Sequence, residues 1–567
     1  MAVQTSYPGV YVTELPSGVR TVTGVATSVT AFVGMTQRGP VNKATPINSL
    51  ADYERVFGGL YKGSTVSFAV RDFFANGGGQ AVVVRLVSKD KDAKNQAAPA
   101  QLTLAAKEPE KPRDSQATTD KTEEVAPARR TQTAAPAVQK PLVLRAVTEG
   151  TWANGLQATV DRNTPPSVTK EVAKQLEVEE TDLFNLVVRL GDKGPQEIFR
   201  NVTVVPSSRQ VDAVLLAESQ LVRVVADPNT AVPASTEKDK PATVSEKGSD
   251  GAALAPGDYI GSEGNDASSN HEGLYALDHV DLFNLLCIPP ATLGGDTDPL
   301  VYQEAQTYCA KRRAVLIVDP PSDMTVANAF DAPSGPSKKK KNLADLNLTG
   351  EGARNSVLYF PRLQQPDPTD RGRIGTFVGC GAIAGVIART DATRGVWKAP
   401  AGVDATLTGI SGLAVNLTDA ENGMLNPHGI NCLRTFPGTG TVLWGARTLR
   451  GADHLGDEYK YLPVRRLALH IEESLFRGTK WVMFEPNDES LWAQIRLNLG
   501  AFMHNLFRQG AFQGTTARDA YFVKCGRETT TPNDVNAGQV NIVVGFAPVR
   551  PAEFVVLQIQ QIAQAQA

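Results

Sequence analysis

The residues best suited to phosphate binding lie at 431–449, in the stretch NCLRTFPGTGTVLWGARTL. It holds Gly438, Gly440 and Gly445, apolar residues between them, and arginines around them. In a nucleotide-binding loop, glycines let backbone N–H groups approach a phosphate, and a nearby cation neutralises its charge. The same residues also fit a tight structural turn. The sequence therefore offers a choice between a phosphate cradle and a turn that binds no small molecule.

The spacing of the glycines argues against nucleotide binding. A P-loop has its lysine after the second glycine, whereas GGLYKGST at 58–65 has it before. A dinucleotide loop reads Gly-x-Gly-x-x-Gly, but GTGTVLWG has four residues after its second glycine. The glycines of NGGGQ at 76–80 are typical of a helix end. We therefore predict no nucleotide cofactor.

Metal ligands and catalytic groups also lack their usual spacings. The six histidines form no HExxH motif, and the five cysteines form no CxxC pair, which favours buried, reduced thiols and no metal. Glu472 and Glu473 are adjacent on an expected helix, so they do not face each other. We find no GxSxG elbow and no convincing Ser-His-Asp set. The sequence therefore favours a structural or binding role, and an α/β hydrolase-like enzyme is the remote alternative.

Composition limits the range of functions. A chain of 567 residues is too long for one core and suggests about three or four domains. Its net charge of −3 argues against bulk nucleic-acid binding, which needs a basic excess. The longest apolar run, at 377–388, is shorter than the roughly 20 residues that span a membrane, and the N-terminus does not resemble a signal peptide. We expect a soluble protein without direct membrane insertion.

Alternating strand and helix signals predict an α/β domain made of two separated pieces. TAFVGMT precedes a helix with Ser64 as N-cap, and AVVVRLV follows that helix. Further continuous apolar strands lie at 282–289, 314–321 and 356–363, as in a parallel sheet covered on both faces. We assign residues 23–88 and 271–430 to this domain.

The remaining chain divides into two predicted linkers and two further domains. Residues 89–140 and 228–270 are rich in small and charged residues and poor in aromatics, so we expect flexible linkers. They enclose a predicted β-rich outer domain at 141–227. The C-terminal domain at 431–567 has helix signals at 463–477 and 487–509, with Asn487 or Asp488 capping the second, followed by three strands.

Both ends of the chain have strand character without a local core. Residues 1–22 contain strand formers interrupted by proline and glycine, which predicts an extended arm. The last expected strand, at 551–562, alternates apolar and polar residues. Because it ends the chain, we predict an edge strand or a partner for another chain.

The stretch NPHGINCLRTFPGTGTVLWGARTL, at 426–449, strongly resembles contractile tail sheath proteins of phages and related injection systems. Several specific motifs agree with this resemblance in the expected order: YPGVYVTELPSG (7–18), TAFVGMTQRGP (30–40), FFANGGGQAVVVRLV (73–87), GVWKAPAG (395–402) and VGFAPVRPAEFVV (544–556). The likeness covers both ends and most of 271–567, but neither 88–140 nor 228–270.

The resemblance implies a multidomain α/β fold with subtilisin-like topology and exchanged terminal strands, but the chain has no usable catalytic triad. It also implies hexameric rings stacked around an inner tube, which contract to drive the tube through a target cell envelope. Expected partners are further copies, the tube protein, and baseplate and terminal cap proteins, and whether a paralogous sheath protein joins them is open. Assembly is expected in a bacterial cytoplasm. The C-terminal half favours an injection system over a myophage virion tail.

Three sets of residues follow from the resemblance. Strand addition to a neighbour would satisfy the backbone of both termini, so we expect the linking residues to be Tyr7, Pro8, Gly9, Val10, Tyr11, Val12, Phe554, Val555, Val556, Leu557 and Ile559. Four arginines of the C-terminal domain are expected to face the tube: Arg465, Arg466, Arg496 and Arg508. The opening stretch becomes a structural turn formed by Gly438, Gly440, Trp444 and Gly445, with Leu443 and Trp444 packed beneath.

Overall fold

The computed structural model describes residues 21–89, 92, 96–107, 140–192, 194–225, 227, 230–237, 240–263, 271–331, 333 and 342–558. Among the expected linking residues, 7–12 and Ile559 lie outside this part of the chain. None of the helices described is long and apolar enough to cross a membrane.

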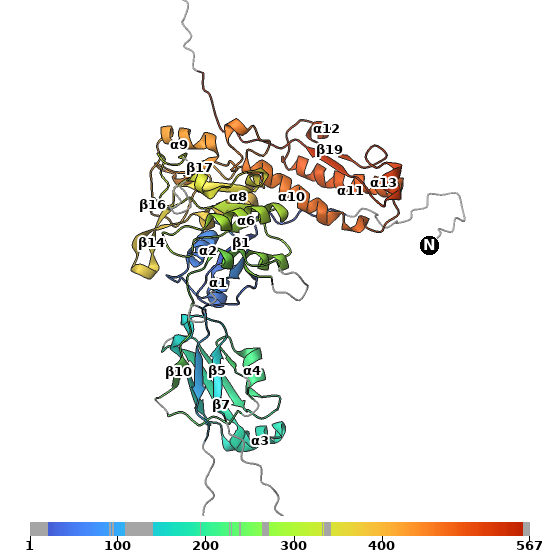
Figure 1. Cartoon of the computed structure of the whole chain (residues 1–567). Coiled ribbons are helices and arrows are strands. Elements are labelled where there is room, and N and C mark those ends of the chain that lie inside the picture. Colours follow the sequence, from blue (N-terminus) through green and yellow to red (C-terminus); the bar gives the residue numbers. More distant parts are fainter. Residues whose placement is uncertain are drawn as a thin grey trace, which may run out of the picture.

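A central eight-stranded sheet organises the molecule (Figure 1). Its strands run in the order β18-β17-β13-β12-β11-β1-β3-β2, and only β2 and β18, at the two edges, are antiparallel to their neighbours. The bounds are β1 (Thr30–Gly34), β2 (Thr45–Ile47), β3 (Ala81–Arg85), β11 (Leu285–Cys287), β12 (Val315–Val318), β13 (Ser356–Phe360), β17 (Ile430–Phe436) and β18 (Gly440–Leu443). Every residue of β1, β3, β11, β12 and β13 is buried, because apolar clusters cover both faces.

Helices form these covering layers. On one face lies α6 (Pro299–Lys311), and on the other lie α2 (Thr65–Ala75), which begins after Ser64 as expected, and α8 (Cys380–Arg394). Smaller elements complete this unit: α1 (Leu50–Phe57), α5 (Pro256–Ile260), α7 (Leu343–Leu346), α9 (Asp419–Leu425), and a three-stranded sheet of β14 (Leu363–Asp367), β15 (Arg373–Phe377) and β16 (Gly412–Leu413). The mixed α/β fold agrees with the sequence prediction.

The boundary at residue 430 needs correction. We predicted that 431–449 opens the C-terminal domain, but β17 pairs in parallel with β13 and carries β18 at its other edge. This segment therefore extends the central sheet. Two glycines of the predicted structural turn, Gly438 and Gly440, lie in the β17–β18 hairpin, where they have φ values of +80° and +87°.

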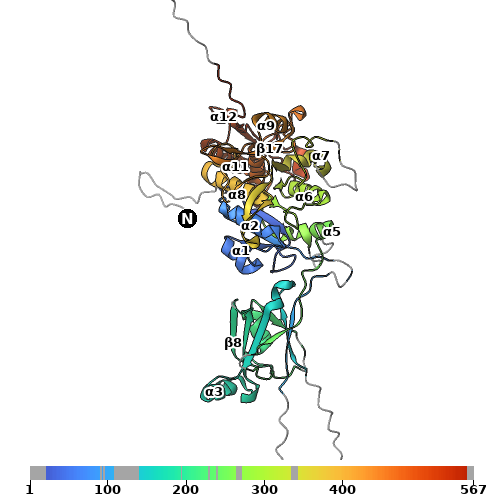
Figure 2. The ribbon, with the colours of Figure 1, turned by 90° about the vertical axis from the view of Figure 1, so that its left-hand side faces the viewer.

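The inserted domain is a seven-stranded antiparallel sheet at the far end of the molecule from the C-terminal helices (Figures 1 and 2). Its order is β8-β7-β6-β10-β4-β5-β9. The bounds are β4 (Gln101–Leu104), β5 (Leu142–Ala146), β6 (Leu156–Asp161), β7 (Phe184–Leu190), β8 (Gln196–Val202), β9 (Val222–Val224), β10 (Ala242–Glu246), α3 (Pro166–Leu176) and α4 (Val211–Glu218).

Two of these strands correct the predicted linkers. Strand β4 lies inside 89–140, and β10 lies inside 228–270, so neither range is linker throughout. Leu102 and Leu104 are buried in the domain core and supply the apolar face that β4 needs. The polar, charged composition around these short strands concealed them in the sequence.

The C-terminal unit is a helical hairpin covered by a small sheet. Helix α10 (Leu462–Gly478) runs into a turn, and α11 (Glu489–Arg508), capped by Asp488, returns. The bounds of the other elements are α12 (Ala517–Ala520), α13 (Pro532–Asn536), β19 (Tyr521–Lys524) and β20 (Val543–Phe546). Strands β19 and β20 form a separate two-stranded antiparallel sheet. A continuous apolar cluster joins α10, α11 and these strands.

The described end of the chain is an extended segment, which we call the C-terminal arm (residues 551–558). We expected a strand at 551–562, but residues 551–558 pair with no strand among those the structure describes. The arm leaves the upper side of the molecule in Figure 1. From Phe554 to Leu557 its side chains are 74% to 81% exposed, although all four are apolar.

Candidate functional site

The geometry of the site begins at the end of β18, where a single asparagine fixes the backbone. Asn431, on β17, donates from Nδ2 to the carbonyls of Leu358 (3.1 Å) and Arg447 (2.8 Å), and its Oδ1 accepts the Arg447 N–H at 2.7 Å. A Cβ at Gly445 would lie 2.7 Å from the same Oδ1, so a larger residue there would displace this side chain. These contacts fix the direction in which Arg447 leaves the sheet.

The Arg447 guanidinium is buried, and all three of its nitrogens donate hydrogen bonds. Its Nη1 donates to the carbonyls of Asn426 (2.9 Å) and Gly451 (3.2 Å) and to Oδ1 of Asp453 (3.0 Å). Its Nε and Nη2 donate to the two carboxylate oxygens of Glu553, at 2.7 and 2.6 Å. This bidentate geometry is the strongest form of an arginine–carboxylate pair.

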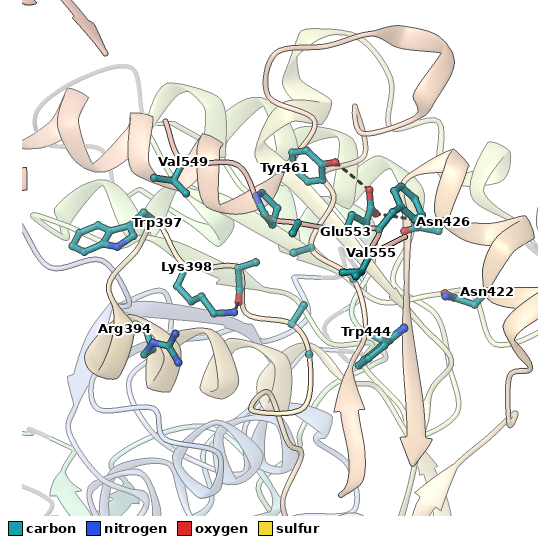
Figure 3. A pocket seen from close by; sticks show the side chains of 18 of the residues that line it. Arg394, Trp397, Lys398, Asn422, Asn426, Trp444, Tyr461, Val549, Glu553 and Val555 are labelled. Carbon is teal, nitrogen blue, oxygen red and sulfur yellow. Dashed lines mark hydrogen bonds between the residues drawn. The ribbon is translucent and has the colours of Figure 1, made fainter. Parts of the chain in front are cut away.

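Glu553 therefore anchors the C-terminal arm to the central sheet. Two further groups hold its carboxylate, Nδ2 of Asn426 at 2.8 Å and the hydroxyl of Tyr461 at 3.1 Å (Figure 3). Burial by itself raises the pKa of Glu553, but the hydrogen bonds from Arg447 and Asn426 outweigh it and hold the pKa below its usual range. We call these four residues (Arg447, Glu553, Asn426 and Tyr461) the C-terminal anchor.

A cavity of about 880 Å³ lies beside the anchor (Figure 3). Two tryptophans line it, Trp397 and Trp444, together with the cations Arg394 and Lys398. Trp444, expected to pack beneath the turn, is half-buried against Phe436, with ring centroids 4.6 Å apart, whereas Leu443 is fully buried. The cavity thus combines apolar side chains with two cations and the Glu553 carboxylate.

The described beginning of the chain is fixed to the C-terminal helices. Val22 is buried in their apolar cluster, and the N–H of Val25 donates to Oγ of Ser474. The carbonyl of Thr27 accepts from Nη2 of Arg466 at 2.8 Å. Both ends of the described chain are therefore fastened to the fold by specific contacts.

The four arginines expected to face a tube occupy different environments. Arg466 is only 4% exposed and forms a buried ion pair with Asp391 of α8, so in this conformation it cannot reach another protein, and that assignment is corrected. Arg465 donates to Asn355 and lies 4.7 Å from the Tyr459 ring centroid. Arg496 pairs with Glu489 at 2.8 Å, and Arg508 is exposed at the end of α11. Arg465, Arg496 and Arg508 therefore remain candidates for an external contact.

Sequence reasoning missed the anchor itself. Arg447 and Glu553 are 106 residues apart, and no local periodicity links them. The signal that was present is a lone acidic residue, Glu553, in the otherwise apolar run AEFVVL. A charged residue on an apolar strand needs a buried partner or a solvent-facing position.

Histidines, cysteines and acidic residues are the side chains most able to form a metal site in the part of the chain that the structure describes. Within it, no cluster of three or more His, Cys, Asp or Glu side chains could hold a metal ion. The five cysteines are free and buried, at positions 287, 309, 380, 432 and 525. The site that the structure does show is the C-terminal anchor, which holds the exposed C-terminal arm on the central sheet.

Comparison with known proteins gives a consistent family. Residues 266–449 match the family of the phage tail sheath protein central domain, and residues 456–562 match the phage tail sheath C-terminal domain. The tail sheath protein of Vibrio phage KVP40 is 32% identical over 194 residues, 34% of this chain and 28% of that protein. The tail sheath protein of Enterobacteria phage T4 is 25% identical over 177 residues, 31% of this chain and 25% of that protein. The chain thus spans only about a quarter of the length of these curated relatives.

Solved structures share the fold over nearly the whole chain. The contracted sheath complex of the extracellular contractile injection system PVC matches with a TM-score of 0.53 at 22% identity, covering 99% of both chains. The contracted helical sheath of the anti-feeding prophage matches with a TM-score of 0.52 at 22% identity, covering 98% of this chain and 99% of that one. A sheath tail protein from Listeria innocua gives 0.54 at 12% identity, covering 93% and 96%. At these identities the likeness concerns the fold alone.

Proposed function

This chain belongs to the contractile tail sheath family, and we propose that it is the structural subunit of a contractile sheath. Its copies form hexameric rings that stack around an inner tube and contract to drive that tube through a target cell envelope. The role is mechanical and not enzymatic. The observation that carries the proposal is the exposed apolar arm that leaves the fold at a buried bidentate ion pair.

The arm has the properties of a strand that pairs with another copy. Its backbone groups have no ladder within the described chain, and four consecutive apolar side chains face solvent. Addition to a neighbour's sheet would satisfy the backbone, and each hydrogen bond would contribute about 0.5–1.5 kcal/mol net. We propose the two-stranded sheet β19–β20 as the receiver, because both of its edges are open in the described chain and a two-stranded sheet alone is marginal. Residues 1–20 would link a second neighbour in the same way.

The anchor suits a link that must survive contraction. During contraction the rigid domains would rotate while the connections between subunits persist. The contact that holds each arm to its own subunit must therefore stay intact. Removing one partner from a buried ion pair costs about 3–5 kcal/mol, because the other charge is left without compensation. The Arg447–Glu553 pair therefore resists release of the arm.

The arrangement of domains suggests which part lies inside. We place the C-terminal unit nearest the tube, by family resemblance, and the inserted domain outermost, at the opposite end of the molecule (Figure 1). The mainly parallel central sheet is compatible with the implied subtilisin-like topology. Partners of this particle would be the tube protein, a baseplate and a terminal cap. We favour a bacterial injection particle, assembled in the cytoplasm, and a myophage virion tail is the second candidate because curated phage sheaths match the chain.

Electron microscopy of the purified chain tests the proposal. Tubes or stacked rings are expected from the full chain, and removal of residues 554–567 should leave a folded subunit that forms neither. Arm-less protein that builds sheaths of normal length would refute the linking role. Dispersed monomers of the full chain with hydrolytic activity would support the enzyme alternative.

A further inference from the structure

The turn between α10 and α11 presents an aromatic side chain that contributes no burial to its own fold. After a short helical turn at Lys480–Val482, Met483 is 64% exposed and Phe484 is fully exposed. Phe484 has a φ of +69°, in the left-handed region that a bulky residue rarely adopts. Glycine would occupy this position with less strain. An exposed, strained aromatic residue suggests a use outside the subunit.

The backbone around Phe484 is held in place. The N–H of Met483 donates to the carbonyl of Lys480 (3.3 Å), and the N–H of Glu485 donates to the carbonyl of Val482 (3.2 Å). On the α11 side, Nδ2 of Asn487 donates to the carbonyl of Gln539 at 2.9 Å. The turn is therefore a preorganised projection, which lowers the entropic cost of binding.

A complementary hollow lies at the other end of the same helical hairpin. The cavity beside the C-terminal anchor includes Tyr461, directly before α10, and Gln509, directly after α11. Helix α10 has 17 residues, so the two ends are separated by about 25 Å at ~1.5 Å per residue. Phe484 therefore cannot enter the cavity of its own chain.

The two ends also match in chemistry. The projection carries apolar Met483 and Phe484 followed by the exposed acid Glu485. Trp397, Lys398 and Trp444 all line the cavity, and Lys398 lies between the two tryptophans in Figure 3. Among the described residues, Lys398 donates to the carbonyl of Ala399 and has no carboxylate partner. Aromatic walls would accept an aromatic side chain, and the cation would face the acid.

We propose that the Met483–Phe484 turn of one copy inserts into the Trp397–Trp444 cavity of the next copy. A projection at one end and its receptor at the other make a head-to-tail contact, which generates rings or open helices and not closed dimers. The inference rests on the proposed polymeric function and names a contact besides the exchanged arms. The cavity could instead bind the arm of a neighbouring copy or a tube protein. The cross-linking test below distinguishes these two occupants from the Met483–Phe484 turn.

Cysteine cross-linking tests the contact directly. In the full chain we would combine Phe484→Cys with Ala401→Cys, a position in the cavity lining. The native cysteines are buried, and a disulfide needs Cα atoms closer than about 7 Å, so the two new thiols can join only between copies. Assembled protein under mild oxidation should give a ladder of covalent multimers on a non-reducing gel. Tubes that form without a ladder would overturn the contact while leaving the sheath function intact.

Side-chain variants distinguish docking from a structural role. Phe484→Gly should keep or raise the thermal midpoint of the subunit, because it relieves strain, yet raise the concentration needed for assembly about tenfold or more. Phe476→Ala removes another exposed aromatic, on α10, and serves as the matched control with normal assembly expected. Lys398→Glu and Glu485→Lys should each weaken assembly, and together they should restore it. Normal assembly of Phe484→Gly, or no rescue by the charge swap, would refute the proposal. A folded full chain that never polymerises would count against both the proposed function and this contact.

Discussion

Replacing Glu553 by glutamine should release the C-terminal arm while leaving the subunit folded. The substitution keeps the size and shape of the side chain and removes its charge. Arg447 donates to both carboxylate oxygens, at 2.7 and 2.6 Å. In Glu553→Gln one of these acceptors becomes an NH₂ group, which faces an N–H donor. Arg447 keeps its bonds to Asn426, Gly451 and Asp453, so the hairpin that carries it should persist.

The size of the effect follows from the bonds that are lost. A hydrogen bond to a charged group contributes about 1.5–3 kcal/mol, and one of the two is removed while the other is weakened. We therefore expect the anchor to weaken by about 2–4 kcal/mol. This corresponds to an increase in the released population of roughly thirty- to several-hundredfold, at tenfold per 1.4 kcal/mol. If the intact pair holds the arm by about 3–5 kcal/mol, bound and released arms become comparable in population.

Hydrogen exchange measured by mass spectrometry reads this population directly. Peptides that cover residues 547–553 should exchange faster in Glu553→Gln, and sedimentation should show a smaller fraction of long polymers. Glu489→Gln is the matched control, because Glu489 forms an exposed ion pair with Arg496 that contributes only about 0–1 kcal/mol. Unchanged exchange at 547–553 in Glu553→Gln, with unchanged polymer length, would show that the ion pair does not retain the arm.

Three further predictions concern charged residues of the subunit. Because Glu553 has a lowered pKa in the folded chain, its contribution is complete above the ordinary glutamate value of about 4.5 and is lost as pH falls through the lower folded value. The protection factor at 547–553, which is the exchange rate corrected for the intrinsic rate at each pH, should therefore be constant from pH 5 to 8 and fall only in stronger acid. Asp391→Asn should lower subunit stability by about 3–5 kcal/mol in chemical denaturation, because Arg466 is then left buried without its counter-charge, and a change below 1 kcal/mol would contradict this. Reversing the charge of Arg496 and Arg508 together should impair assembly on tubes without unfolding the subunit, and stable tube-filled sheaths at ordinary salt would exclude them from the tube interface.

The sequence predicted those elements whose signals are local. Helix α11 begins after Asp488, which caps it, and α2 begins after Ser64, although the Ser64 hydroxyl donates to the Met35 carbonyl and does not cap the helix. Capping residues and apolar periodicity can be recognised within one or two turns of sequence. Strands β4 and β10 were missed since each is short and is surrounded by polar residues, so their pairing depends on distant strands. Strand propensity depends on such context more than helix propensity does.

The arginines show the same limit: their helix positions could be predicted from nearby residues, but their distant partners could not. Helical periodicity places Arg466 on α10 correctly but cannot reveal that Asp391 of another helix lies beside it. Likewise, the turn at Gly438 was expected from composition, whereas the role of Arg447, nine residues later, depends on Glu553 near the end of the chain. The family resemblance selected the right segments of sequence, and only the folded geometry assigned contacts to individual side chains.

The position of the anchor indicates how force would pass through the subunit. Arg447 follows β18, which pairs with β17, and β17 pairs in parallel with β13 in the middle of the central sheet. Asn431 of β17 bonds to both the Leu358 carbonyl of β13 and the backbone of Arg447. Tension on the arm at Glu553 therefore reaches the central sheet through hydrogen bonds and one ion pair, and it reaches the α10–α11 hairpin through Tyr461, directly before α10.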